Sequence, residues 1–190
     1  MKKLAVFLPG AAAIKALLKR LIITIVLLAC ACQPARPHHF VNTAFSFDYP
    51  ARWQLMSELW PGYQTGGEYK GLGVEEIITI TSVRKQGQFG IWFTVASAPM
   101  PGDLSMESTL EQLYQGLPGG LRDLKIESLT IDGKKATKAS YQRPWGDPWW
   151  QFQDFWLEND RTLYLLSFHA LNNAGQREYD FILDSFSFRD

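Results

Sequence analysis

Alternation of apolar and polar residues along most of the chain after residue 44 constrains the fold more than any other feature of the sequence. A period of two places successive side chains on opposite faces, so alternating or strongly β-branched segments predict strands. The segments of this kind are 45–49, 53–56, 76–84, 89–98, 124–131, 136–142, 149–158 and 161–170. Asp132-Gly133 lies between two of them and is a strong signal for a tight hairpin turn. We therefore expect consecutive strands to pair antiparallel.

Two segments depart from the strand pattern and repeat their apolar residues at helical spacing. One spans residues 105–117, and the other is expected to begin at Asn172 or Asn173. The glycine-rich residues 59–73 predict a loop that crosses a surface, and residues 185–188 predict an edge strand or extended tail. Runs of strands with few helices indicate an α+β fold. We expect an antiparallel sheet of about six or seven strands, with helices and loops covering both faces.

The first 29 residues have the parts of a secretory signal peptide. Five basic residues and no acidic residue precede a short apolar run, Leu21–Ala31, which ends in small residues. This run is shorter than the roughly 20 residues that a transmembrane helix needs. The sequence therefore predicts a secreted precursor.

The end of this leader, Leu27-Leu28-Ala29-Cys30-Ala31-Cys32, resembles the bacterial lipobox. That resemblance implies cleavage before a cysteine that carries acyl chains such as palmitate, with Cys30 as the first choice and Cys32 as the alternative. An ordinary cleaved signal peptide is the other interpretation, and a Cys30–Cys32 disulfide would be strained by the single residue between them. We expect a signal peptide at 1–29, a proline-containing tether at 30–39 and a folded domain at 40–190.

Charge and cysteine content exclude several classes of protein. The chain from Cys30 onward has 161 residues, with 14 basic and 19 acidic residues and a net charge of −5. Nucleic-acid binding calls for a concentrated basic face, so we expect no nucleic-acid partner. No cysteine follows Cys32, so the folded domain has no internal disulfide and depends on its core for stability.

Four features together resemble the PsbP-like family, whose fold is shared with the Ran-binding Mog proteins. They are the opening 45–50 followed by Trp53, the 131–136 hairpin, the strand pair that turns at 158–164, and the closing segment 179–188. The resemblance covers residues 40–190. It implies an α-β-α sandwich that acts as a non-catalytic binding or assembly module, and it carries no functional residue onto this chain.

The sequence offers little material for catalysis or for a metal. His38 and His39 are adjacent on the predicted tether, where they lack the fixed geometry that a metal site demands. His169 lies alone on a predicted strand and is expected to be a structural histidine. Asp147 and Asp154 could be paired carboxylates of a hydrolase, but we expect both to be solvated surface groups. We therefore predict no enzyme, no cofactor and no metal.

Aromatic residues mark the candidate binding surface. Residues 145–152 contain four aromatic side chains together with Pro148 and Gly146. Trp150 and Phe152 share a strand face and are expected to be buried. The candidate contact residues are Trp145 and Trp149, with Trp60 and Tyr63 of the glycine-rich loop as weaker members of the same surface.

These inferences predict a lipid-anchored, non-enzymatic domain of the cell envelope. It would lie on the outer face of the cytoplasmic membrane or on the outer membrane, where it binds or helps assemble a membrane-associated protein complex. The alternative is a lipoprotein that binds a carbohydrate or another small ligand through its aromatic loop.

Overall fold

The computed structural model describes residues 35–83, 89–100, 106–144, 149–171 and 175–189. Its chain divides into two units, residues 1–36 and 37–190, and the described elements all belong to the second. The strands are β1 (His38–Val41), β2 (Phe45–Tyr49), β3 (Trp53–Leu55), β4 (Glu75–Val83), β5 (Phe89–Pro99), β6 (Arg122–Ile131), β7 (Lys134–Pro144), β8 (Trp149–Asn159), β9 (Thr162–Ala170) and β10 (Ser187–Phe188). The described helices are α2 (Met56–Leu59), α3 (Met106–Gln115) and α4 (Gln176–Ser185). None of them is both long and apolar enough to cross a bilayer.

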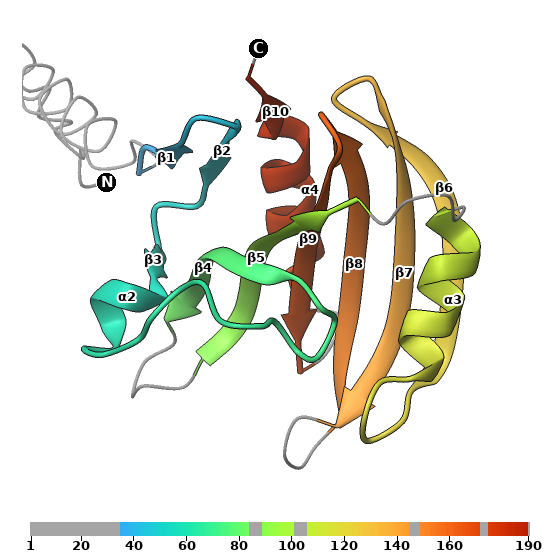
Figure 1. Ribbon diagram of the computed structural model, residues 1–190. Coiled ribbons are helices and arrows are strands. Elements are labelled where there is room, and N and C mark those ends of the chain that lie inside the picture. The colour runs from blue at the N-terminus through green and yellow to red at the C-terminus, as the bar shows by residue number, and fades with distance from the viewer. Residues whose placement is uncertain (1–34, 84–88, 101–105, 145–148, 172–174, 190) are drawn as a thin grey trace, which may run out of the picture. The chain divides into compact units, whose positions relative to one another are not determined.

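Seven strands form one antiparallel sheet in the order β3-β4-β5-β9-β8-β7-β6 (Figure 1). The α+β fold and the antiparallel sheet predicted from the alternation are therefore confirmed. The Asp132-Gly133 turn is also confirmed, with φ values of 49° and 70° at its two residues. Positive φ at both central residues is the geometry that lets a two-residue turn match the twist of its strands.

Strands β1, β2 and β10 form a second, smaller sheet that alternation alone does not separate from the first. Phe45–Tyr49 is a strand, as expected, but it pairs with His38–Val41 and with the chain's end rather than with β3. The expected edge strand at residues 185–188 is therefore present as the short β10. His38 and His39, which we expected on the tether, lie in β1.

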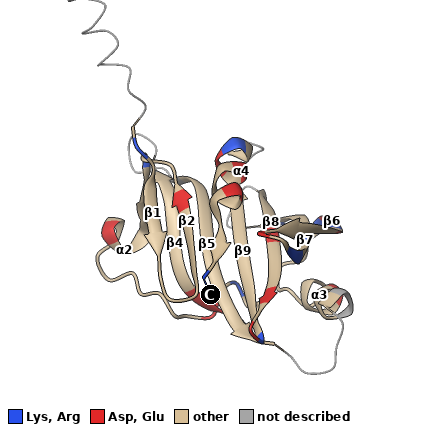
Figure 2. Ribbon diagram, turned by 90° about the horizontal axis from the view of Figure 1, so that it is seen from above, with Lys and Arg blue, Asp and Glu red and all other residues tan. Residues whose placement is uncertain are grey.

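The first face of the large sheet, here called the aromatic face, is covered by α4 and the small sheet. Figure 2 shows α4 and α3 on opposite sides of the strands. Phe168 stacks on Phe93 with 4.4 Å between ring centroids, and the ring centroid of Tyr179 in α4 lies 4.4 Å from that of Phe168. Phe47 of β2 meets Phe93 edge to face at 5.2 Å. This core is almost entirely apolar and aromatic.

The second face, here called the loop face, is covered by residues 60–74 and α3. Its buried apolar residues come from the loop, the helix and the strands, and include Leu72, Leu110 and Trp156. Unlike the aromatic face, it also buries the polar side chains Asp154, Ser167 and His169, each at most 1% exposed.

The start of α4 differs from the expected asparagine cap. The helix begins after Gly175, which has φ of 100° and makes no side-chain capping bond. A Cβ at this position would lie 2.6 Å from Cδ1 of Ile91, so the close approach to β5 requires glycine. Asn172 and Asn173 lie outside the described residues.

Candidate functional site

The loop that covers the sheet is held by its own tight turn. Tyr69 donates its backbone N–H to the Val74 carbonyl at 2.8 Å, and Leu72 donates to the Tyr69 carbonyl at 2.9 Å. Lys70, between them, has a positive φ of 52°. Because Tyr69, Leu72 and Val74 are all buried, the turn is anchored in the core and presents Lys70 to the sheet at a fixed place.

Lys70 enters the sheet's polar interior from this turn. Its Nζ donates to Ser167 Oγ at 2.8 Å and lies 3.9 Å from the ring centroid of Phe152. Arg143 donates to the Lys70 carbonyl at 3.1 Å and so holds the backbone of the turn. Burial lowers the pKa of Lys70 to about 7, while the charge of Asp154 opposes this shift.

Asp154 is the acceptor at the centre of this interior. It is fully buried and accepts hydrogen bonds from Tyr114 at 2.8 Å, from Tyr141 at 2.6 Å and from Ser167. Burial, followed by the charge of Asp154, raises the pKa of both tyrosines well above the usual 10.0. The expectation that Asp154 is a solvated surface group is therefore wrong. It shares its strand face with Phe152 and Trp156, and α3 covers that face.

His169 is buried next to this cluster, as expected for a structural histidine. Its ring stacks on Phe152 at 5.0 Å and on Trp92 at 5.5 Å between centroids. Burial, followed by the charge of Lys70, places its pKa well below the usual 6.5. The ring is therefore neutral at physiological pH.

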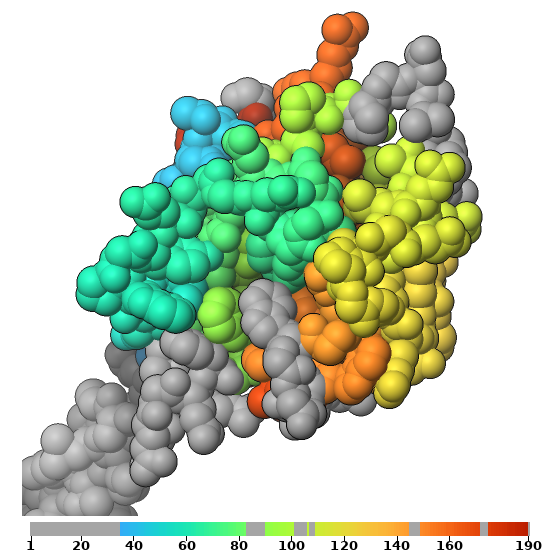
Figure 3. All heavy atoms as spheres, turned by 60° about the horizontal axis from the view of Figure 1, so that its bottom comes forward, coloured from blue at the N-terminus to red at the C-terminus, as the bar shows by residue number. Residues whose placement is uncertain are grey.

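An open depression lies between this polar interior and the solvent. It encloses about 470 Å³, which is within the range of about 300–1,000 Å³ for small-molecule sites. We call it the Trp60 pocket, and its lining includes Trp60, Tyr63, Glu68, Lys70, Glu76 and Trp92. Figure 3 shows the loop as teal and green spheres beside the yellow spheres at and after α3.

The wall of the Trp60 pocket contains an organised carboxylate. Glu76 accepts hydrogen bonds from Tyr63 and, at 2.7 Å, from Thr79. Thr79 is in turn 2.8 Å from the Thr94 hydroxyl. Burial and the bond to Glu76 raise the pKa of Tyr63, so the phenol remains a donor. At the rim, Trp60 is 58% exposed.

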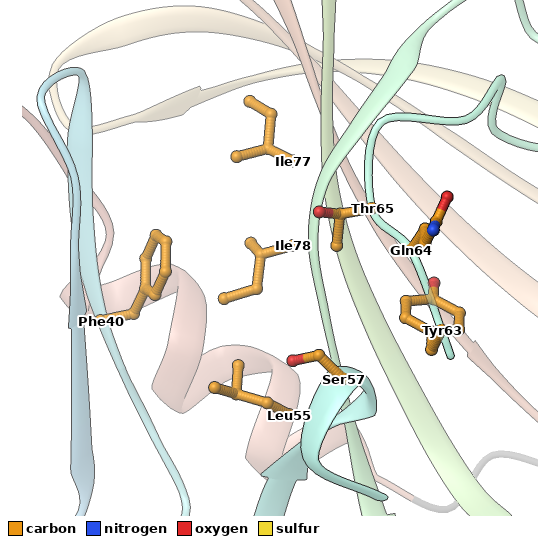
Figure 4. A pocket seen from close by; sticks show the side chains of 8 residues that line it. All are labelled: Phe40, Leu55, Ser57, Tyr63, Gln64, Thr65, Ile77 and Ile78. Atoms are coloured by element: carbon orange, nitrogen blue, oxygen red, sulfur yellow. The ribbon is translucent and has the colours of Figure 1, made fainter. Parts of the chain in front are cut away.

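A second depression of about 460 Å³ adjoins the first, and Tyr63 lines both. Figure 4 shows Phe40, Leu55 and Ile78 facing one another, with Tyr63 and Gln64 set apart from them. Its lining combines these apolar side chains with the polar side chains of Ser57, Gln64 and Thr65, and none of the described residues in it is charged.

The structure brings together only part of the predicted aromatic surface. Trp60 and Tyr63 line the same pocket. Trp149 is half-buried rather than exposed, and the guanidinium of Arg122 lies 3.9 Å from its ring centroid. It precedes Trp150, which packs against the loop face, so alternation directs Trp149 away from Trp60. Trp145 and Asp147 lie outside the described residues.

Sequence reasoning missed Lys70, Glu76 and Trp92 as residues of the site. A signal existed for Trp92, since it alternates with the buried residues Ile91 and Phe93 and must face the other side of the sheet. No local pattern marks Lys70, because its hydrogen-bond partner Ser167 is 97 residues away in the sequence.

The two adjacent histidines are arranged as strand residues. His38 Nε2 donates to the Ala51 carbonyl at 3.1 Å, and His39 Nδ1 lies 2.7 Å from Oδ1 of Asp48. Successive side chains of a strand point to opposite faces, so these rings do not converge on one ion. Within the described ranges, no group of three or more His, Cys, Asp or Glu residues could hold a metal.

Comparison with known proteins supports the fold. No family model matches the chain, and no curated protein matches it by sequence. The solution structure of cyanobacterial PsbP (CyanoP) from Synechocystis sp. PCC 6803 aligns with a TM-score of 0.54 and 15% identity, over 83% of this chain and 95% of its own. The chain therefore has the PsbP-like fold that the sequence resemblance implied.

Two further structures are similar at lower identity. A protein of Bacteroides thetaiotaomicron aligns with a TM-score of 0.52 and 10% identity, over 80% of this chain and 48% of its own. LpqN of Mycobacterium tuberculosis, which is involved in cell envelope biogenesis, aligns with a TM-score of 0.46 and 12% identity, over 84% of this chain and 87% of its own. At 10% identity, the likeness to the Bacteroides protein concerns the fold and not the function.

Proposed function

We propose that this chain is a lipid-anchored, non-enzymatic domain of the cell envelope that binds, and helps assemble, a membrane-associated protein complex. The observation that carries the binding role is the Trp60 pocket, where an exposed indole stands at the rim of a preformed depression. The lipobox-like residues 27–32 support the anchor.

The burial of the serine that contacts Lys70 supports a binding role over a catalytic one. Lys70 donates to Ser167 Oγ, a contact that resembles a serine–lysine pair. However, Ser167 is fully buried and donates its own proton to Asp154. A nucleophile must reach its substrate, so this arrangement favours a structural role for the serine. The same burial argues against Asp154 as a hydrolase carboxylate.

The anchor is tested by the intact mass of the membrane-extracted protein. We expect an acylated chain that begins at Cys30, a Cys30→Ser variant that lacks the added mass, and a Cys32→Ser variant that keeps it. A soluble, unmodified chain cut at another position would contradict the anchor.

The binding surface is tested by capturing partners from membranes with Trp60→Ala, using Phe181→Ala as the matched control. Phe181 lies in α4, on the opposite side of the sheet, and is 40% exposed. Both variants remove an exposed aromatic ring, so they differ mainly in the face that they alter. We expect Trp60→Ala to lose partners that Phe181→Ala retains. Identical partners for both variants would contradict the assignment of this face.

A small ligand is the second candidate function. The volume of the Trp60 pocket and its mixture of aromatic and polar side chains favour it. The two functions are compatible, because one anchored domain can hold a ligand in the pocket while its rim contacts a protein.

A further inference from the structure

We propose that the Trp60 pocket binds an uncharged, hydroxyl-rich ligand, a short saccharide. This inference deepens the proposed function, since it names the ligand class of the same site. It rests on the pocket's charge balance, on its aromatic rim and on the placement of its hydrogen-bonding groups.

The charges of the pocket disfavour ions of either sign. Glu68 and Glu76 line it, so an anionic ligand would be repelled by two carboxylates. Lys70 lines the same space, and the fraction of it that is protonated near its pKa of about 7 would repel a ligand cation. Opposite charges on the wall around one cavity suit a neutral ligand that both donates and accepts hydrogen bonds.

The aromatic residues suit the flat, apolar faces of a sugar ring. Trp60 exposes 58% of its surface at the rim, where an indole face is accessible for stacking. Trp92 and Tyr63 add apolar surface to the wall. Small-molecule sites combine such surfaces with a few polar groups that fix orientation.

The polar groups of the pocket are positioned before a ligand arrives. Oε1 of Glu76 accepts from both Tyr63 and Thr79, which holds in one place a carboxylate that lines the pocket. The Lys70 turn is fixed by Ser167 and Arg143. Preorganised groups lose little entropy on binding, which increases affinity.

The test is calorimetric titration of the mature protein in a polyoxyethylene detergent, since sugar-based detergents would compete for the site. The probes are glucose, galactose, mannose, N-acetylglucosamine and maltose, with tetramethylammonium chloride and sodium phosphate as charged comparisons. We expect saturable heat with at least one saccharide and none with either ion. We expect the affinity for that saccharide to fall about tenfold in Trp60→Ala and about tenfold or more in Glu76→Gln, and to be unchanged in Phe181→Ala.

Two outcomes would overturn the inference. One is the absence of heat with every saccharide, and the other is saturable binding of tetramethylammonium or phosphate in place of a sugar. Neither would decide the proposed function, which is tested by partner capture. Conversely, saccharide binding together with identical partners for Trp60→Ala and Phe181→Ala would contradict the assembly role while supporting the ligand.

Discussion

The two faces of the seven-stranded sheet are both buried, but they are built differently. The aromatic face packs rings such as Phe93 and Phe168 against α4 and the small sheet. The loop face buries a carboxylate and a histidine among tyrosines, and the half-buried Lys70 donates to a buried serine of the same face. The central strand β9 and its neighbour β5 contain no Asp, Glu, Lys or Arg (Figure 2), so the charges of the loop face come from other elements.

The aromatic face is held mainly by apolar packing, whereas the loop face also uses directional hydrogen bonds that fix the positions of its side chains. Apolar burial is favourable but non-directional, and it suffices to hold α4. Hydrogen bonds to a buried carboxylate specify one geometry, and breaking them is costly. On the loop face they fix Lys70, next to the Trp60 pocket, to strands that come much later in the chain.

The largest effect is expected from removing a central ring of the aromatic face. Phe168→Ala should lower the free energy of unfolding by about 3–5 kcal/mol, because it leaves a cavity between Phe93 and Tyr179. Urea denaturation measures this loss. A loss of less than about 1 kcal/mol would mean that the aromatic face is not the main source of stability.

A smaller loss is expected when one donor is removed from the carboxylate of the loop face. Tyr141→Phe keeps the ring but leaves Asp154 without one of its hydroxyl donors. We expect a loss of about 1–3 kcal/mol in the free energy of unfolding. Denaturation monitored by circular dichroism tests this, and a neutral result would show that the network does not need the Tyr141 hydroxyl.

The lysine of the loop face should make the stability of the domain depend on pH. The pKa of Lys70 is about 7 in the folded protein and ordinarily 10.5, so between these values the unfolded chain holds a proton that the folded chain lacks. The free energy of unfolding should therefore rise with pH from about 7 to 10. Above 10 the buried tyrosines oppose the rise, because they ionise only in the unfolded chain.

Lys70→Met should abolish this rise, and thermal denaturation at pH 7, 8, 9 and 10 measures it. The effect should be modest, since Lys70 is only half-buried as a residue and solvent screens its charge. An unchanged profile in Lys70→Met would assign the rise to another group.

The smallest effect is expected at a hydroxyl of the aromatic face. Among the described residues, the buried Tyr179 hydroxyl has no hydrogen-bond partner. Tyr179→Phe should therefore leave the free energy of unfolding unchanged or raise it by about 1 kcal/mol. The same substitution, Tyr to Phe, is then destabilising on one face and harmless on the other. Equal losses for Tyr141→Phe and Tyr179→Phe would break the distinction.

The sequence predicted the elements better than their assembly. Strand positions follow from local alternation, so the bounds of β4 to β9 were predicted to within two residues at each end. The assignment of Phe45–Tyr49 to a separate sheet depends on β10, more than 130 residues away, and no local pattern encodes that pairing. Only the fold-level resemblance conveyed the overall arrangement.

The site was predicted only in part, for the same reason. Trp60 and Tyr63 are close in sequence and were found together. The burial of Asp154 could have been predicted from the sequence. Phe152, Asp154 and Trp156 are spaced two residues apart, so their side chains lie on the same face of the strand and share one environment. The link between Asp154 and Lys70 through Ser167 depends on tertiary contacts, so it could not be predicted from the sequence.

Photo-crosslinking in intact cells, with a photoreactive phenylalanine analogue placed at position 60 or at position 181, shows which face of the sheet binds an envelope component. We expect covalent adducts with an envelope component from position 60 and none from position 181. Adducts from position 181 alone, or equal adducts from both positions, would contradict the assignment of binding to the loop face.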